Sequence, residues 1–276
     1  MLNGKKIGFV GAGNMAEAMM KGLLHSGVSK PQNVVASDVR KDRLGFIKEL
    51  FDVSVCEKNE EVVDQADLVV LAVKPQILEP VLLELADHLD TSKLIISIAA
   101  GVSLATIESH LKKDLRLIRA MPNIAALVLE SATAICPGKH ASQEDLQLAK
   151  AVFDSVGTTV TIEEGLMDAV TGLSGSGPAY LFLIIDALAD AGVKVGLSRH
   201  NALTLSAQTV LGAAKLLIET GEHPGRLKDL VTSPGGTAIA GLHTLEEGGL
   251  RTTLINAVEV AARRSGELGK LLNNRS

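Results

Sequence analysis

Hydrophobic residues in the first part of the chain gather in short β-branched runs that alternate with segments of helical periodicity. Two of these runs, 67–73 and 94–98, are apolar almost throughout, as is typical of parallel strands covered on both faces. The alternation therefore predicts a doubly wound α/β sheet. The predicted strands are Ile7–Val10, Asn33–Ser37, Val53–Val55, Leu68–Val73, Leu94–Ile98, Arg116–Ala120, Ala132–Ile135 and Thr158–Ile162.

The pattern changes near residue 162, where strand signals end and helical periodicity continues to the last residues. The segment Pro178–Val195 is apolar almost all round, so it has to be covered on every side. About 110 residues of helix form little core alone, which predicts that two copies of the chain share this core in a dimer. The predicted helices are Glu164–Leu173, Pro178–Val195, Arg199–Thr220, Pro224–Val231, Thr237–Glu247 and Gly249–Leu268.

A glycine-rich turn follows the first predicted strand. Gly11, Gly13 and Ala16 have the G-x-G-x-x-A spacing of a dinucleotide-binding fingerprint, with a strand before it and an amphipathic helix after it. Gly11 permits the tight turn, Gly13 lets backbone amides approach a pyrophosphate, and the small Ala16 lets the helix lie close to the sheet. The helix N-terminus then directs free amides and the positive end of its dipole at the anion. The motif predicts a nucleotide site.

Ligands of doubly wound sheets bind beyond the carboxyl ends of the strands, so the residues at those ends are candidates for the site. Glycine and proline also end strands for purely structural reasons. Five such ends on one edge of the sheet nevertheless favour a functional site. They read Gly11-Ala12-Gly13, Asp38, Val73-Lys74-Pro75, Ala99-Ala100-Gly101 and Met121-Pro122-Asn123.

A second glycine loop, Thr232–Thr237, opens a helix in the C-terminal part of the chain. Its consecutive glycine amides and hydroxyl groups at a helix N-terminus suit a carboxylate. The alternative is that Ser233 and Thr237 only cap the helix. Together with the nucleotide motif, the loop predicts an oxidoreductase that acts on a small acid.

The composition excludes several classes of protein. The formal net charge is −5 and there is no long basic block, which argues against nucleic acid as a partner. Cys56 and Cys136 are too few and too far apart for a disulfide scaffold or a zinc site, so we expect buried, reduced thiols in a cytoplasmic protein without a bound metal. No stretch is expected to be long enough to span a bilayer, so no membrane association is predicted.

Motifs along essentially the whole chain resemble those of the pyrroline-5-carboxylate reductases. No one motif is decisive, but their order and spacing together are highly specific. They are GFVGAGNMAEAMMKG near the N-terminus, LAVKP at 71–75, SIAAGVS at 97–103, IRAMPN at 118–123, GLSGSGPAY at 172–180, ETGEHPGRLKDLV at 219–231, TSPGGT at 232–237 and INAVE at 255–259.

This resemblance implies an N-terminal Rossmann-type domain over residues 1–162 and an all-α domain over residues 163–276 that forms homodimers, and often decamers of five dimers. It implies that NADPH or NADH reduces the C=N bond of 1-pyrroline-5-carboxylate to L-proline. The substrate carboxylate is expected at Ser233 and at the amides of Gly235, Gly236 and Thr237. The cofactor is expected at Val10, Gly11, Ala12, Gly13, Asn14, Met15, Asp38, Arg40, Asn59, Ala72, Val73, Lys74, Pro75, Ile98, Ala99 and Ala100.

Two positions depart from the pattern of the family. Ile124-Ala125 stands where the family has Thr-Pro, and Ala238 stands where it has a threonine whose hydroxyl lies near the ring nitrogen. Thr237 is the neighbouring residue, but neighbours on a helix point about 100° apart. We therefore assign no catalytic proton donor. A protonated imine is already electrophilic, so orientation of the hydride donor supplies much of the acceleration.

The residues leave several points open. Asp38 suits the ribose hydroxyls of NADH, whereas Arg40, Lys41 and Arg43 suit the 2′-phosphate of NADPH, and the family precedent favours NADPH with NADH also used. His243, Lys74 and Tyr180 are predicted to have structural or cofactor-contacting roles rather than catalytic ones.

Other functions fit part of the pattern: a related imine reductase, a β-hydroxyacid reductase, and a nucleotide sensor without catalysis. The β-hydroxyacid dehydrogenases use an Asn-x-x-Lys pair on an interdomain helix, and here that spacing occurs only at Asn3 and Lys6, before the first strand. A nucleotide sensor would keep the nucleotide half and would not need the second anion loop.

Overall fold

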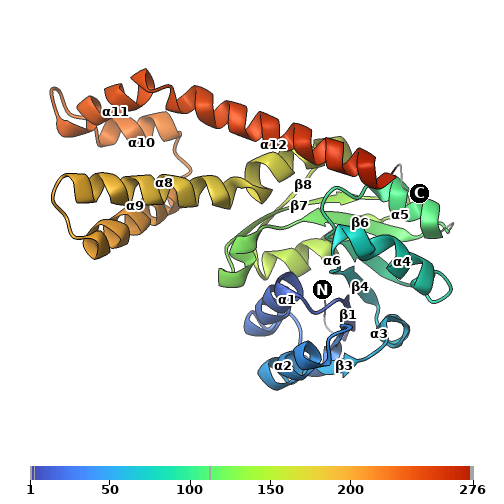
Figure 1. Cartoon of the computed structure of the whole chain (residues 1–276). Helices are drawn as coiled ribbons and strands as arrows, with labels where there is room; N and C mark the ends of the chain where they lie inside the picture. Colours follow the sequence, from blue (N-terminus) through green and yellow to red (C-terminus); the bar gives the residue numbers. More distant parts are fainter. Residues whose placement is uncertain (1, 3, 112, 274–276) are drawn as a thin grey trace. The chain divides into compact units, whose positions relative to one another are not determined.

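The computed structural model describes residues 2, 4–111 and 113–273. The chain divides into two compact units, one formed by Met1–Ser176 with Glu259–Ser276 and the other by Gly177–Val258. The domain boundary expected between residues 162 and 163 stays a prediction. The first unit extends to Ser176 and also includes the end of the last helix. Figure 1 colours the chain from blue at its N-terminus to red at its C-terminus.

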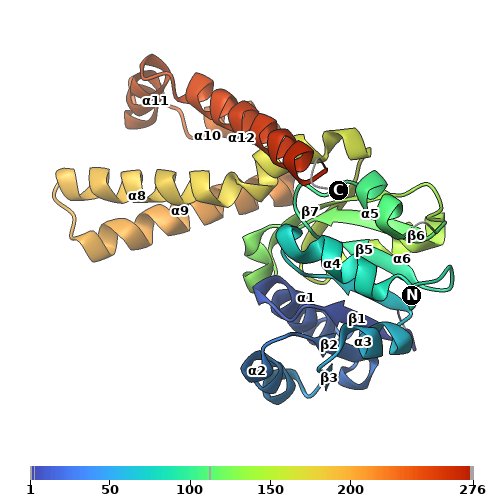
Figure 2. The same cartoon turned by 45° about the vertical axis from the view of Figure 1, so that its right-hand side comes forward.

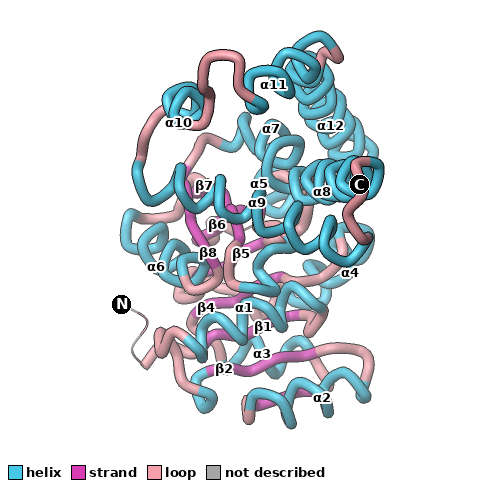
Figure 3. The backbone as a smooth tube through the Cα atoms, turned by 90° about the vertical axis from the view of Figure 1, so that its left-hand side faces the viewer, coloured by secondary structure: helices cyan, strands magenta, loops and turns pink. Residues whose placement is uncertain are grey.

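A mixed sheet forms the centre of the first unit (Figures 1 and 3) and has eight strands among the described residues, in the order β3-β2-β1-β4-β5-β6-β7-β8. Neighbouring strands from β3 to β6 are parallel, β7 is antiparallel to β6, and β8 is parallel to β7. The predicted strands are all confirmed, with ends that shift by at most two residues. They are β1 (Ile7–Val10), β2 (Val34–Ser37), β3 (Ser54–Cys56), β4 (Leu68–Leu71), β5 (Leu94–Ser97), β6 (Arg116–Met121), β7 (Ser131–Pro137) and β8 (Gly157–Thr161).

The reversed direction of β7 has a simple physical cause. Residues 122–130, which include the short 3-10 helix η2 (Ile124–Val128), connect β6 to β7. A parallel crossover takes a dozen or more residues, so a connection of this length returns the chain in the opposite direction.

Helices cover both faces of the sheet. Successive side chains of a strand point to opposite faces, so Phe9 of β1 belongs to one core cluster and Val10 to the other. The predicted doubly wound architecture is confirmed, and its core is largely aliphatic. On the Phe9 side lie α1 (Asn14–His25), α2 (Lys41–Phe51) and α6 (Gln143–Asp154); on the Val10 side lie α3 (Asn59–Gln65), α4 (Pro75–Leu85) and α5 (Leu104–Leu111).

A buried carboxylate ties the first residue of β6 to α6. Asp145 accepts hydrogen bonds from Arg116 Nε at 3.1 Å and from Ser142 N at 2.8 Å, and it also pairs with Arg116 Nη2. Ser142 and Asp145 form a capping box at the start of α6. Burial raises the pKa of Asp145, but the Arg116 guanidinium and the Ser142 donors outweigh it, so the net shift of this pKa is downward.

The segment after β8 differs from the single helix expected over Glu164–Leu173. It consists of the 3-10 turn η3 (Glu164–Leu166), the short helix α7 (Met167–Val170) and a π-helical turn η4 (Thr171–Gly175). At this turn the Ser176 N–H donates to the Thr171 carbonyl, five residues earlier, at 2.8 Å.

The end of α12 (Leu250–Asn273) lies close against the rest of the first unit through small residues. Ser265 Oγ donates to Asp168 Oδ1 at 2.6 Å. A Cβ on Gly269 would lie only 2.9 Å from the Gly101 carbonyl oxygen, so a larger residue would push the helix away.

The second unit is helical. α8 (Gly177–Lys194) and α9 (Arg199–Thr220) lie side by side (Figure 2), and α10 (Pro224–Leu230), α11 (Thr237–Glu247) and the first residues of α12 complete the unit. In α8 only Ala189 is buried, whereas Leu183 is 71% exposed. An apolar helix left open to this extent in one chain is typical of an interface with another chain.

The expectation that no stretch is long enough to span a bilayer was wrong, because one helical run meets the criteria of length and composition. The helical run Glu164–Lys194 has 31 residues, and its most apolar window has a mean hydropathy of 1.3 and is 11% buried. A single helix of this kind is weak evidence for a membrane span, because apolar helices of soluble proteins meet the same criteria.

Candidate functional site

The turn after β1 has the conformation that its glycines predict. Gly11 has a φ of 95°, in the left-handed region where a side chain is strained, and a Cβ there would lie 2.8 Å from the Ala72 carbonyl oxygen. A Cβ on Gly13 would instead meet nothing within 4 Å. The space in front of Gly13 is therefore open to a ligand, which fits the approach of a pyrophosphate.

Helix α1 begins at this turn with an open N-terminus. Its N-cap, Gly13, makes no side-chain cap hydrogen bond, so the first backbone amides of α1 are available to an anion. A cavity of 460 Å³ lies beside the turn, at the carboxyl ends of β1, β2 and β4. Eight of the predicted cofactor residues line it: Gly11, Gly13, Asp38, Arg40, Asn59, Ala72, Val73 and Lys74.

Asp38 is fixed at the end of β2 by main-chain donors. Its Oδ2 accepts from the Ala12 N–H at 3.0 Å, and its Oδ1 accepts from the Arg40 N–H at 3.0 Å. These bonds connect the fingerprint turn to the turn after β2. A carboxylate held this way suits the ribose hydroxyls of a dinucleotide.

The three cations that follow Asp38 are not equivalent. Lys41 pairs with Glu57 at 2.8 Å on the surface. Arg43 donates to the Ala12 carbonyl at 2.6 Å and pairs with Glu17, and its side chain is only 14% exposed. Of the three, Arg40 lines the cavity.

Asn59, at the start of α3, is oriented by two neighbours. Its Oδ1 accepts from Ser37 Oγ at 2.8 Å, and its Nδ2 donates to Glu84 Oε2 at 3.1 Å. These bonds hold the amide in one orientation, and Asn59 lines the cavity.

The other predicted cofactor residues do not line this cavity. Ala100 lies on a second cavity, of 230 Å³, at the carboxyl end of β5. The side chains of Val10, Ala12 and Ala99 are buried, so any contact of theirs with a ligand would use backbone atoms. Asn14, Met15, Pro75 and Ile98 are partly or fully exposed but line neither cavity.

Two lining residues were not predicted from the sequence, Ile77 and Val81, and a third, Val39, belongs to the expected cofactor turn Asp38–Arg40. Val39 stands between two predicted residues and is 93% exposed, an unusual position for a valine. Ile77 and Val81 are four residues apart and share one face of α4. In the sequence nothing distinguishes this pair from the other apolar residues of α4.

The second glycine loop also leaves a helix N-terminus open. The N-cap of α11 is Gly236, without a side-chain cap hydrogen bond, so the capping role considered for Ser233 and Thr237 is not observed. Gly235 has a φ of 66°, and a Cβ on Gly236 would lie 2.3 Å from Ser233 Oγ. The loop therefore depends on Gly235 for its conformation, and a side chain at 236 would force the Ser233 hydroxyl to move.

The remaining candidate groups have local roles. His243 Nε2 lies 3.4 Å from Glu247 Oε1 on the surface of α11. Cys136 is free and buried, and burial raises the pKa of its thiol to about 11, so it is a poor nucleophile. Cys56 is also free but only half-buried, contrary to expectation, because β3 is an edge strand.

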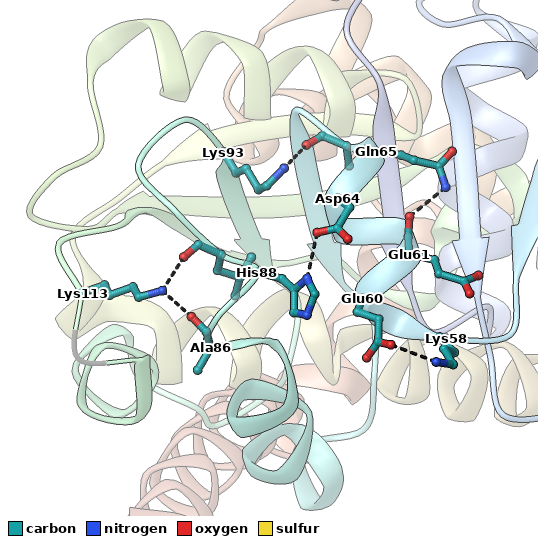
Figure 4. Close-up of polar contacts among 11 residues, drawn as sticks. Lys58, Glu60, Glu61, Asp64, Gln65, Ala86, His88, Lys93 and Lys113 are labelled. Atoms are coloured by element: carbon teal, nitrogen blue, oxygen red, sulfur yellow. Dashed lines mark hydrogen bonds and ion pairs between the residues drawn. The ribbon is translucent and has the colours of Figure 1, made fainter.

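Ionisable side chains on the α3 and α4 side of the sheet are engaged in contacts with neighbouring elements (Figure 4). Asp64 of α3 and His88, in the turn after α4, are 2.8 Å apart, and their hydrogen bond raises the pKa of His88. Lys93 donates to the Ala66 carbonyl at 3.1 Å, and Lys113 donates to main-chain carbonyls after α4. These contacts hold the loops in place.

Two family models match the chain. The model described as pyrroline-5-carboxylate reductase dimerisation matches residues 164–268. The model described as NADP oxidoreductase, coenzyme F420-dependent, matches residues 6–101. The second match contains the fingerprint turn and the whole cavity beside it.

Curated relatives are similar along nearly their whole length. The pyrroline-5-carboxylate reductase of Methanosarcina acetivorans is 52% identical over 98% of this chain and 100% of its own length. The pyrroline-5-carboxylate reductase of Arabidopsis thaliana is 47% identical over 96% of each chain.

Solved structures agree with these relatives. A pyrroline-5-carboxylate reductase from Coxiella burnetii has a TM-score of 0.92 and 39% identity, covering 96% of this chain and 98% of its own. A pyrroline carboxylate reductase from Plasmodium falciparum with NADP bound has a TM-score of 0.85 and 34% identity, with the same coverage. The chain is an oxidoreductase with NAD(P)H as its cofactor and a domain that supports oligomerisation. It belongs to the pyrroline-5-carboxylate reductase family.

Proposed function

We propose that the chain reduces 1-pyrroline-5-carboxylate to L-proline, the last step of proline biosynthesis, with NADPH as the preferred hydride donor. The observation that carries this proposal is the presence, in one chain, of a dinucleotide cavity and a second uncapped glycine loop. The first suits a pyrophosphate and the second a carboxylate. The relatives named above carry the name of this reductase, which supports the same substrate.

The residues beside the first cavity fit a dinucleotide. The open space in front of Gly13 and the first amides of α1 are proposed to take the pyrophosphate. Asp38 and Asn59 are proposed to bind the ribose, and Arg40 the 2′-phosphate that distinguishes NADPH from NADH. When bound, the cofactor supplies the hydride.

The loop before α11 is proposed to orient the substrate. Ser233 and the amides of Gly235, Gly236 and Thr237 would hold the carboxylate of the cyclic imine. Fixing the imine in one orientation supplies acceleration by proximity, and a protonated imine needs no further activation. Ala238 carries no hydroxyl, so no proton donor is assigned on α11.

The assembly is proposed to be a homodimer, with decamers of five dimers as the larger form. The exposed apolar side chains of α8 and α9 support the dimer, because they need a cover that one chain does not provide. Sedimentation as a monomer at micromolar concentration would contradict it. The cytoplasm is proposed as the location, which the two free cysteines support.

NADPH oxidation by the purified protein with racemic 1-pyrroline-5-carboxylate tests the function, with chiral analysis of the product and NADH in parallel. Formation of L-proline is the expected result. Binding of NADPH without turnover would favour the nucleotide sensor, and turnover only with a β-hydroxyacid or another cyclic imine would favour those reductases.

The substrate loop has its own test in the same assay. Gly236→Ala displaces Ser233 and is expected to raise KM for the imine, whereas the dissociation constant of NADPH should not change. Gly241→Ala, on the same helix where a Cβ meets nothing within 4 Å, is the matched control. Equal kinetics of both variants would mean that the carboxylate binds elsewhere.

A further inference from the structure

A buried asparagine joins the carboxyl end of β6 to the π-helical turn η4. Asn123 Nδ2 donates to the Ser174 carbonyl at 2.9 Å. Its Oδ1 accepts from the Ala125 N–H at 3.1 Å, and its own N–H donates to Ser131 Oγ at 3.1 Å. Asn123 is only 8% exposed, so its side chain serves to hold these segments together.

The sequence explains why the Ser174 carbonyl needs this donor. In an α-helix the carbonyl of Ser174 would accept from the N–H of residue 178. Residue 178 is Pro178, which has no N–H. A main-chain carbonyl that loses its helical donor inside a protein has to be paired in another way. Asn123 supplies the missing donor from 51 residues away.

The turn that Asn123 holds forms part of a cavity wall. A Cβ on Gly175 would lie 2.9 Å from Met121 Cε, so the turn packs closely on the end of β6. Thr171, the first residue of the turn, and Ser176, directly after it, line the cavity of 230 Å³ together with Ala100 at the carboxyl end of β5. The position of η4 therefore sets one side of this space, and α12 forms another.

The strand order places this space where the reactive half of a dinucleotide would lie. β5 and β6 are on the opposite side of β1 from β2, whose end carries Asp38. A dinucleotide whose adenosine ribose lies at Asp38 and whose pyrophosphate lies at Gly13 extends across β1 and β4 towards β5 and β6. Ala100 is also among the cofactor residues that the family resemblance implies.

We propose that Asn123 is a positioning residue for hydride transfer: it locks the π-helical turn Thr171–Gly175 against β6 and so fixes the wall of the space beside Ala100. The inference rests on the proposed function, because it assigns the nicotinamide end of the cofactor to this space. Asn123 acts through the turn, since its Nδ2 is directed at Ser174 rather than into the cavity. π-Helical turns inside longer helical runs are frequent at functional sites.

The first variant is Asn123→Asp, which keeps the acceptor for Ala125 and loses the donor to Ser174. Hydrogen–deuterium exchange of the protein without cofactor should be at least about fivefold faster in a peptide that covers residues 171–176. In steady-state kinetics kcat should fall about tenfold, because small displacements of reacting groups slow the step strongly. KM for NADPH should change by less than about twofold, since the pyrophosphate and ribose residues are untouched.

Pro178→Ala provides a rescue. The alanine restores an N–H that can donate to the Ser174 carbonyl. Asn123→Asp should therefore lower kcat much less in the Pro178→Ala background than in the native one. Exchange of residues 171–176 should slow in parallel. This coupling between two positions is not expected if Asn123 only stabilises the fold.

Asp145→Asn is the control for lost stability, because Asp145 acts at the opposite end of β6, where it holds Arg116. It should leave exchange of residues 171–176 unchanged. Unchanged exchange in Asn123→Asp, or equal losses of kcat with and without Pro178→Ala, would overturn the inference. Exchange is measured without substrate, so it tests the contact between Asn123 and the turn independently of activity. Absence of turnover in the native chain would refute the proposed function, and the exchange result would still show whether Asn123 holds the turn.

Discussion

Removal of the Arg40 guanidinium is expected to weaken NADPH and to spare NADH. Arg40 lines the dinucleotide cavity next to Asp38, and its side chain is 58% exposed. Lys41 and Arg43 pair with other carboxylates and do not line the cavity, whereas Arg40, although 3.5 Å from Asp38, does line it. Arg40 is therefore the cation of this turn that is placed to meet a 2′-phosphate.

The size of the effect follows from the surroundings of Arg40. A hydrogen bond between charged groups contributes about 1.5–3 kcal/mol. Arg40 is exposed to solvent and its Nε lies 3.5 Å from the Asp38 carboxylate. Both weaken its attraction to a 2′-phosphate, so we expect a free energy in the lower half of that range. About 1.5–2 kcal/mol corresponds to a loss of roughly 10- to 30-fold in kcat/KM for NADPH. NADH lacks the phosphate, so its kcat/KM should change by less than about threefold.

The assay compares initial rates of imine reduction by native protein and Arg40→Ala with each cofactor at one low ionic strength. Lys41→Ala is the matched control. Loss of its surface pair with Glu57 should change kcat/KM for either cofactor by less than about twofold. Equal losses for NADPH and NADH, or the same loss in Lys41→Ala, would refute the assignment of Arg40. A native kcat/KM for NADH more than about tenfold above that for NADPH would overturn the preference itself.

Three further changes test the framework of the site. Asp145→Ala should lower the free energy of unfolding by about 3 kcal/mol, because it leaves Arg116 unpaired and removes the capping box. Urea unfolding at one protein concentration measures it. The folded pKa of Asp145 lies below its unfolded value, so this stabilisation is present above about pH 4 and is lost as the pH falls through the folded pKa; a difference that persists at lower pH would contradict the argument. Gly11→Ala should weaken NADPH binding about tenfold or more in a fluorescence titration, whereas Gly45→Ala, where a Cβ meets nothing within 4 Å, should not. The hydrogen bond to Asp64 raises the pKa of His88, so this contact stabilises the fold below about pH 6.5 and the stabilisation is lost as the pH rises through the raised pKa. An NMR titration should give a lower pKa for His88 in Asp64→Asn, and an unchanged value would show that Asp64 is not the cause.

The nucleotide part of the candidate site could be predicted because its parts are local. Gly11 and Gly13 act through the conformation of one turn, and Asp38 stands at the end of a strand that the hydrophobic pattern already marks. Ile77 and Val81 could not be identified in the same way. They are ordinary apolar residues of α4, and they gain a place in the site only when the ends of β2 and β4 meet at one cavity.

The sequence by itself determined the order of the strands and long helices, the two-faced α/β core and the family, because hydrophobic period, turn glycines and motif order are all local properties of the chain. Tertiary structure decided which polar groups form hydrogen bonds and ion pairs with one another. Arg43 is held by Glu17, 26 residues away, and Asn123 by Ser174, 51 residues away, whereas Arg40 is left beside the cavity. Hydrogen bonds between residues so distant in sequence depend on how the sheet brings their elements together, and no local pattern contains that information.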